Sequence, residues 1–148
     1  MAKKRKVLFV DKKNDLQSQI AEYFLKKDHG DFFEAYSASD EWDIVDCDLL
    51  SVMLSMGHDI RRHFSKHFDA LPKIEFDYLV AFGELGEMTL KRAPKFDKLI
   101  VCKIAGSESF QASDDRELEE CYISLVNRIH EWVDETFASY ASADQASE

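Results

Sequence analysis

The stretch that decides the fold runs from Val7 to Glu22 and reads VLFVDKKNDLQSQIAE. Its first four residues are apolar without alternation, which is typical of a parallel strand covered on both faces. The polar residues that follow indicate a loop, and apolar residues at positions 16, 20 and 24 then recur at the spacing of an amphipathic helix. In open α/β folds, a loop between the first strand and a helix is a common place for anions and ligands. Function should therefore be sought first in residues 11–18.

The same order of strand and helix repeats along the chain. Strands are predicted at residues 6–10, 32–37, 76–82 and 98–102, and helices at residues 16–27, 48–56, 84–92 and 114–137. Asp48 is the expected cap of the second helix. Alternating strands and helices indicate parallel βαβ units. We therefore predict one α/β domain over residues 1–138, three-layered and doubly wound around a four-stranded parallel sheet, with residues 139–148 as a polar tail that frays.

Composition argues against several classes of function. The formal net charge is −10, so nucleic acids and anionic membrane surfaces would be repelled. No apolar run approaches the ~20 residues of a membrane helix. The three cysteines are odd in number and far apart, which indicates neither a disulfide framework nor a zinc site: Cys47, Cys102 and Cys121. We expect a cytoplasmic protein that binds neither nucleic acid nor membrane, with a protein partner possible.

Several patches of the sequence, in the right order, resemble the low-molecular-weight protein tyrosine phosphatases and their thioredoxin-coupled arsenate-reductase relatives. The similar patches are residues 7–10 with 18–22, 33–38, 52–60 with His63, Ser65 and Lys66, and 75–80. The resemblance implies the fold predicted above and a phosphate-binding loop after the first strand. In that family a thiolate attacks phosphorus, backbone amides cradle the phosphate oxygens, and an arginine clamps two of them.

The family's loop consists of a cysteine, five residues, an arginine and a serine, and this chain departs from it at both essential positions. Asp11 stands where the cysteine belongs and Gln17 where the arginine belongs. Asn14 and Ser18 match residues that brace the loop in the family. The binding positions that the resemblance assigns to the loop and its rim are Asp11, Lys12, Lys13, Asn14, Asp15, Leu16, Gln17, Ser18 and Trp42.

The other reactive groups of the family are also missing. The family places an Asp-Pro general acid after the fourth strand, where this chain has residues 104–110 with Glu108 as their one carboxylate. The redox cysteines of arsenate reductases would follow the third strand, where residues 82–87 contain no cysteine. No catalytic residue is therefore expected.

Asp11 also opposes phosphate binding directly, because a carboxylate in contact with a phosphate dianion costs several kcal/mol in a partly desolvated site. Lys12 and Lys13 supply positive charge, but only as flexible point charges. If the loop still turns its amides inward, the Asp11 carboxylate can occupy the anion position itself. We hypothesise that the loop is filled in this way.

Two functions follow from these residues. The first is a catalytically inactive phosphatase-like protein, a pseudophosphatase that acts as a binding or regulatory module without cofactor or metal. The alternative is an enzyme with altered chemistry that uses Asp11 as nucleophile or metal ligand. Residues 10–16 also resemble the start of response-regulator receivers, which hold magnesium with acidic residues, but the third strand ends Val80-Ala81-Phe82 without the required aspartate. His58, His63 and His67 are interpreted as a polar helix face, not as a zinc site.

Overall fold

The centre of the computed structural model is a four-stranded sheet in the order β2-β1-β3-β4, with every strand parallel to its neighbours. The structure describes residues 3–83 and 85–146, and side chains as far as residue 140. The strands are β1 (Arg5–Val10), β2 (Phe33–Ser37), β3 (Phe76–Phe82) and β4 (Phe96–Cys102). The predicted four-stranded parallel sheet is confirmed.

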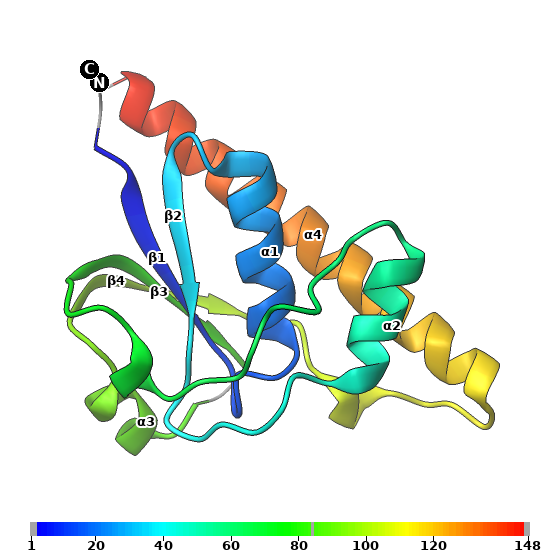
Figure 1. Cartoon of the computed structure of the whole chain (residues 1–148). Coiled ribbons are helices and arrows are strands. Elements are labelled where there is room, and N and C mark those ends of the chain that lie inside the picture. The colour runs from blue at the N-terminus through cyan, green and yellow to red at the C-terminus, as the bar shows by residue number, and fades with distance from the viewer. Residues whose placement is uncertain (1–2, 84, 147–148) are drawn as a thin grey trace.

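Helices cover both faces of this sheet, which gives the predicted three layers (Figure 1). The helix α1 (Gln17–His29) and the long helix α4 (Asp115–Ala146) pack together on one face, and α2 (Cys47–Ser55) packs against α4. The short helix α3 (Glu87–Arg92) and a 3-10 turn at Phe68–Ala70 lie on the other face. None of the described helices is long and apolar enough to cross a membrane.

The apolar run of β1 is divided between the two faces of the sheet. Val7 and Phe9 join the core under α1 and α4, whereas Leu8 and Val10 join the core on the opposite face. All four side chains are fully buried. Because successive strand residues point to opposite faces, a strand covered on both sides must be apolar at every position. The run therefore places the end of β1, and the loop that follows it, at the centre of the sheet.

Several helix boundaries differ from the predicted ones. The cap of α2 is Asp46 and not Asp48: its Oδ1 accepts the amides of Asp48 at 2.9 Å and Leu49 at 3.1 Å. The helix α3 begins at Glu87, after Gly86, instead of at residue 84, which lies outside the described residues. The start of α4 was predicted closely, and Asp114 Oδ1 accepts the amide of Glu117 at 2.8 Å.

The end of α4 is the largest departure from the predicted elements. The helix continues to Ala146 instead of ending at Phe137, so most of the expected polar tail is helical, and of that tail only residues 147–148 lie outside the described residues. Alanine is the best helix former, and it recurs at positions 138, 141, 143 and 146. The helix propensity of these alanines extends α4 through residues whose small and polar side chains otherwise resemble a tail.

Candidate functional site

The loop between β1 and α1 is closed by its own first residue. Asp11 is only 2% exposed, and its Oδ2 accepts the backbone amides of Ser18 at 2.8 Å and Leu16 at 3.4 Å. These amides belong to the start of α1, whose cap residue Leu16 makes no side-chain capping bond. The first amides of a helix lack partners within the helix and attract negative charge. The Asp11 carboxylate therefore takes the role of an anion bound at a helix N-terminus.

Burial makes this carboxylate unusual as an acid. Burial raises the pKa of Asp11 above its ordinary value, and the hydrogen bonds from Ser18 oppose the rise without cancelling it. The second oxygen, Oδ1, has no hydrogen-bond partner among the described residues. A buried charge with one unpaired oxygen is held at a free-energy cost, so the surrounding structure must hold it in place.

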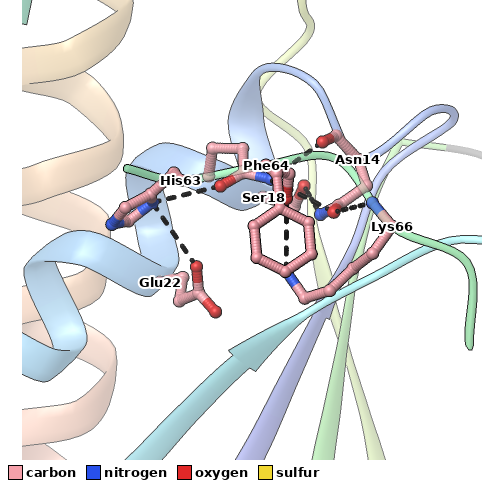
Figure 2. A network of polar contacts seen from close by, with 7 residues as sticks. Asn14, Ser18, Glu22, His63, Phe64 and Lys66 are labelled. Carbon is pink, nitrogen blue, oxygen red and sulfur yellow. Dashed lines mark hydrogen bonds and ion pairs between the residues drawn. The ribbon is translucent and has the colours of Figure 1, made fainter. Parts of the chain in front are cut away.

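Asn14 is the central brace of the loop. Its backbone adopts a φ of 53°, a left-handed conformation that asparagine tolerates better than most residues. Its Nδ2 donates to Ser18 Oγ at 2.9 Å, and its Oδ1 accepts the amide of Lys66 at 3.0 Å and Gln19 Nε2 at 3.1 Å. Figure 2 shows the segment that carries Phe64 and Lys66 meeting Asn14 from across the loop. The bracing role expected for Asn14 and Ser18 is what these contacts perform.

Two serines hold the loop's backbone from outside. Ser39 Oγ, fully buried, donates to the carbonyl of Asp11 at 2.6 Å, and Ser65 Oγ donates to the carbonyl of Lys13 at 2.7 Å. Because buried carbonyls need donors, both contacts favour one loop conformation over others. The loop is thus fixed by Ser39 from the chain that follows β2, by α1 and by the segment that precedes the 3-10 turn.

A charged cluster lies beside this brace. His63 Nδ1 is 3.6 Å from Glu22 Oε2 and 3.2 Å from Gln19 Oε1, and Figure 2 shows the His63 and Glu22 side chains pointing toward one another. Burial raises the pKa of Glu22, against the opposing charge of Lys66, and burial lowers the pKa values of His63 and Lys66. The cluster ties α1 to residues 63–66, the segment that braces the loop.

A cleft of about 700 Å³ opens above the loop at the carboxyl edge of the sheet. Its walls come from the loop itself, from the chain before α2, and from the loops that follow β3 and β4. Among the residues that the structure describes, its charged lining consists of five carboxylates and three lysines: Asp11, Asp15, Glu41, Asp46, Glu108, Lys12, Lys13 and Lys103. Carboxylates outnumber cations, so the charge of the described lining disfavours an anionic ligand.

Asp15 shows the effect of this crowding. Burial, followed by the neighbouring charges of Asp11 and Asp46, raises the pKa of Asp15 to about 6. Asp46 is anchored in turn, because its amide donates to the carbonyl of Asp15 at 3.0 Å and its Oδ2 accepts the hydroxyl of Tyr122 at 2.7 Å. The cleft therefore holds a group that changes charge near neutral pH, a property common at functional sites and also found in structural clusters.

Gln17, at the position of the family's arginine, lies beside Glu108, the one carboxylate in the loop of the family's general acid. Neither side chain can do the work of the residue that it replaces. Gln17 packs against Gly106. A Cβ added to Gly106 would lie 2.8 Å from Gln17 Nε2, 2.9 Å from Gln17 Oε1 and 2.9 Å from Glu108 Oε2. Glu108 turns back on its own loop, and its Oε1 accepts the amide of Gly106 at 3.0 Å. Gln17 carries no charge to clamp a phosphate, and Glu108 is engaged by its own backbone.

The structure brings six of the nine expected site residues into the cleft and places three elsewhere. Asn14 and Ser18 lie behind the loop as braces. Trp42 is 61% exposed, its ring lies 5.5 Å from His67, and its neighbour Glu41 lines the cleft in its place. The lining residues that the sequence did not single out include Asp46 and Lys103. Lys103 directly follows β4 at the carboxyl edge of the sheet, a position that could have identified it, whereas Asp46 lies well beyond β2 and directly precedes α2.

The histidines do not form the helix face that was expected. Residues 58–67 contain no helix, and the two histidines four apart have different partners: His63 contacts Glu22, whereas His67 contacts Asp40 and Asp69. Within the described chain, one group of three or more ligating side chains has all its ligand atoms within 4.8 Å, and it is Asp28, His130 and Asp134, far along α1 from the loop. Asp11 belongs to no such group of ligating side chains among the described residues.

No protein-family model matches the chain, and no curated protein matches its sequence. Solved structures do match it. An arsenate reductase in its oxidized state has a TM-score of 0.72 at 20% identity, with 91% of this chain and 98% of that chain covered. The thioredoxin-dependent arsenate reductase of Corynebacterium glutamicum has a TM-score of 0.69 at 19% identity, over 96% of this chain and 64% of that chain. A low-molecular-weight protein tyrosine phosphatase from T. tengcongensis has a TM-score of 0.64 at 18% identity, over 91% and 99%.

These neighbours define the class of fold. The chain has the α/β fold shared by arsenate reductases and low-molecular-weight tyrosine phosphatases, as the resemblance of its sequence implied. At identities of 18–20% the likeness concerns the fold, and the chemistry has to be argued from the residues of the site.

Proposed function

We propose that this chain is a non-catalytic protein of the low-molecular-weight phosphatase fold, a pseudophosphatase that acts as a binding or regulatory module. The observation that carries the proposal is the pair of hydrogen bonds from the Ser18 and Leu16 amides to Asp11 Oδ2. The loop keeps its amides pointing inward and supplies its own anion. Asp11 and Gln17 stand where the nucleophile and the phosphate clamp would be required.

The charge of the cleft supports a cationic occupant over a phosphate. Five carboxylates and three lysines of the described residues line the cleft, and the whole chain carries a net charge of −10. A lysine or arginine side chain presented by a protein partner would be attracted there, and a nucleic acid or an anionic membrane would be repelled. The three cysteines are free, which is compatible with a reducing cytoplasm, the location we propose.

The alternative, an enzyme that uses Asp11 as nucleophile or metal ligand, has less support. A nucleophile needs a lone pair that can reach a substrate, whereas Asp11 Oδ2 accepts two amides and Oδ1, although it has no partner among the described residues, is buried in a residue that is 2% exposed. A metal ion would need further ligands around Asp11, and no such group surrounds it in the described chain.

The test restores the arginine together with either the nucleophilic cysteine or an unreactive serine. The wild type, Asp11→Cys/Gln17→Arg and Asp11→Ser/Gln17→Arg are assayed with p-nitrophenyl phosphate and titrated with inorganic phosphate and vanadate. We expect no vanadate-sensitive turnover in the wild type, slow turnover in the first double variant because the general acid is still missing, and phosphate binding without turnover in the second. The serine variant is the matched control, because it keeps the cradle and lacks the thiolate.

Two results would overturn the proposal. Wild-type turnover that vanadate inhibits would show an active enzyme. Vanadate or phosphate seen in the loop of the unaltered protein would show that Asp11 does not fill the anion position.

A further inference from the structure

A second group of ligating side chains lies between α1 and α4, at the end of α1 away from the loop. Asp28 comes from the last turn of α1, and His130 and Asp134 lie one turn apart on α4. His130 Nε2 is 2.7 Å from Asp28 Oδ2 and 3.6 Å from Asp134 Oδ2. Two carboxylates thus approach the same ring nitrogen, and all three ligand atoms lie within 4.8 Å of one another.

The side chains of this group are oriented by neighbours that are not themselves ligands. The buried ring of Phe24 stacks on the His130 ring, with centroids 3.7 Å apart and planes 9° apart, which fixes the direction of Nε2. His29 Nε2 lies 2.8 Å from Asp134 Oδ1, which leaves the other oxygen of Asp134 for the His130 side. Such second contacts are what orient the ligands in metal sites.

The separations suit a small transition-metal ion. A tetrahedral zinc ion with bonds of about 2.0–2.1 Å holds its ligand atoms ~3.3 Å apart. The observed 2.7 Å and 3.6 Å lie on either side of that value, so small side-chain rotations suffice. The Asp28 and His130 side chains are 31% and 34% exposed, which gives an ion and a water molecule access. One imidazole nitrogen with two carboxylate oxygens suits Zn²⁺ or Co²⁺ better than Ca²⁺ or Mg²⁺.

His67 supplies the contrast that distinguishes a site from ordinary ion pairing. It also contacts two carboxylates, but Asp40 approaches its Nε2 at 3.7 Å and Asp69 its Nδ1 at 3.4 Å. Those carboxylates lie on opposite sides of the ring and cannot share one ion with it. At His130 both carboxylates converge on a single nitrogen.

We propose that Asp28, His130 and Asp134 bind one divalent transition-metal ion of the zinc type, through His130 Nε2 and one oxygen of each aspartate. A fourth position remains open to water. The ion would join the end of α1 to the middle of α4, and it is independent of the function proposed for the cleft.

The test titrates zinc into chelator-treated full-length protein by calorimetry. We expect one equivalent to bind, with affinity lowered at least tenfold in Asp28→Asn and in His130→Gln and unchanged in His67→Gln, the matched control. Zinc should raise the melting temperature of the wild type and not that of Asp28→Asn, a variant on the surface that leaves the Phe24–His130 stack intact.

Cobalt identifies the donor atoms. The Co²⁺ spectrum should lack a thiolate charge-transfer band, because no cysteine belongs to the site. No zinc binding, wild-type affinity in both variants, or a thiolate band that assigns the ion to a cysteine would each overturn the proposal.

Discussion

The backbone amide of Ser18 donates to the Asp11 carboxylate at 2.8 Å, which ties the end of β1 to the first turn of α1 across the whole loop. The fold places helix amides at this point whatever the loop contains, so some acceptor must satisfy them. In a phosphatase of this fold the acceptor is the bound phosphate. Here a side chain of the loop itself, the Asp11 carboxylate, provides the acceptor.

Replacing Asp11 by asparagine should make the stability of the protein less sensitive to a rise in pH above about 4. The pKa of Asp11 is raised in the folded state, so the native protein holds its proton more tightly than the unfolded chain, whose value is ~3.9. The wild type must then lose stability as pH rises from about 4 through the folded pKa. Asp11→Asn keeps an oxygen for the two amides and lacks that loss. Urea denaturation at several pH values should show Asp11→Asn gaining on the wild type as pH rises.

The matched control is Asp11→Ala, which also removes the charge but leaves the Ser18 and Leu16 amides without their acceptor. We expect it to be less stable than Asp11→Asn by about 1–3 kcal/mol. Equal stability of the two variants would contradict the idea that the carboxylate oxygen satisfies these amides.

Asp15 should titrate well above an ordinary aspartate. Its folded pKa is about 6 against 3.8 for the free side chain, so its contribution to stability falls as pH rises between those values and is constant above them. Two pKa units correspond to ~3 kcal/mol, and we expect on the order of 1–2 kcal/mol because the side chain reaches solvent in the cleft. NMR titration of the Asp15 carboxyl carbon measures the pKa directly. In Asp11→Asn it should move toward 3.8, since Asp11 is one of its causes, and an unchanged value would contradict that coupling.

Among the uncharged residues of the loop, Asn14 should be the one whose substitution lowers the free energy of unfolding most. Asn14→Ala removes the side-chain bonds to Ser18, Gln19 and Lys66, and it places alanine, which disfavours left-handed backbone, at a φ of 53°. We expect a loss of about 3 kcal/mol or more in the free energy of unfolding. Asn14→Gly relieves the backbone strain but not the lost bonds, so it should recover roughly 1 kcal/mol of that loss. A glycine variant no better than alanine would show that backbone conformation contributes little.

The sequence was sufficient for the sheet, the layers and the position of the loop, because these depend on short-range patterns. The apolar run of β1 and the spacing of residues 16, 20 and 24 on α1 reflect burial, which acts on every residue of an element. The braces of the loop were predicted only through resemblance to a family. Nothing in the local sequence says that Ser39 and Ser65 meet the loop, since each lies more than 25 residues from its acceptor.

Trp42 and Asp46 illustrate what local patterns cannot decide. Both lie in the acidic stretch before α2, and an aromatic residue is the more conspicuous candidate for the rim of a pocket. The capping bonds of Asp46 to Asp48 and Leu49 and its bond to Tyr122 direct it toward the cleft wall, whereas Trp42 turns to His67. The choice depends on α4, which begins nearly 70 residues later in the chain.

Cys47 and Cys102 should differ in how fast they react with a thiol reagent. Cys102 ends β4 beside Phe82, and burial raises its pKa to about 11, so almost none of it is thiolate at neutral pH. Cys47 is exposed and should react first with a thiol reagent such as iodoacetamide. Mass spectrometry of briefly alkylated native protein should find label on Cys47 and none on Cys102 until denaturant is added. Cys47→Ser should abolish the fast reaction. Rapid labelling of native Cys102 would contradict its burial and would place a usable thiolate at the carboxyl edge of the sheet, where a phosphatase of this fold needs one.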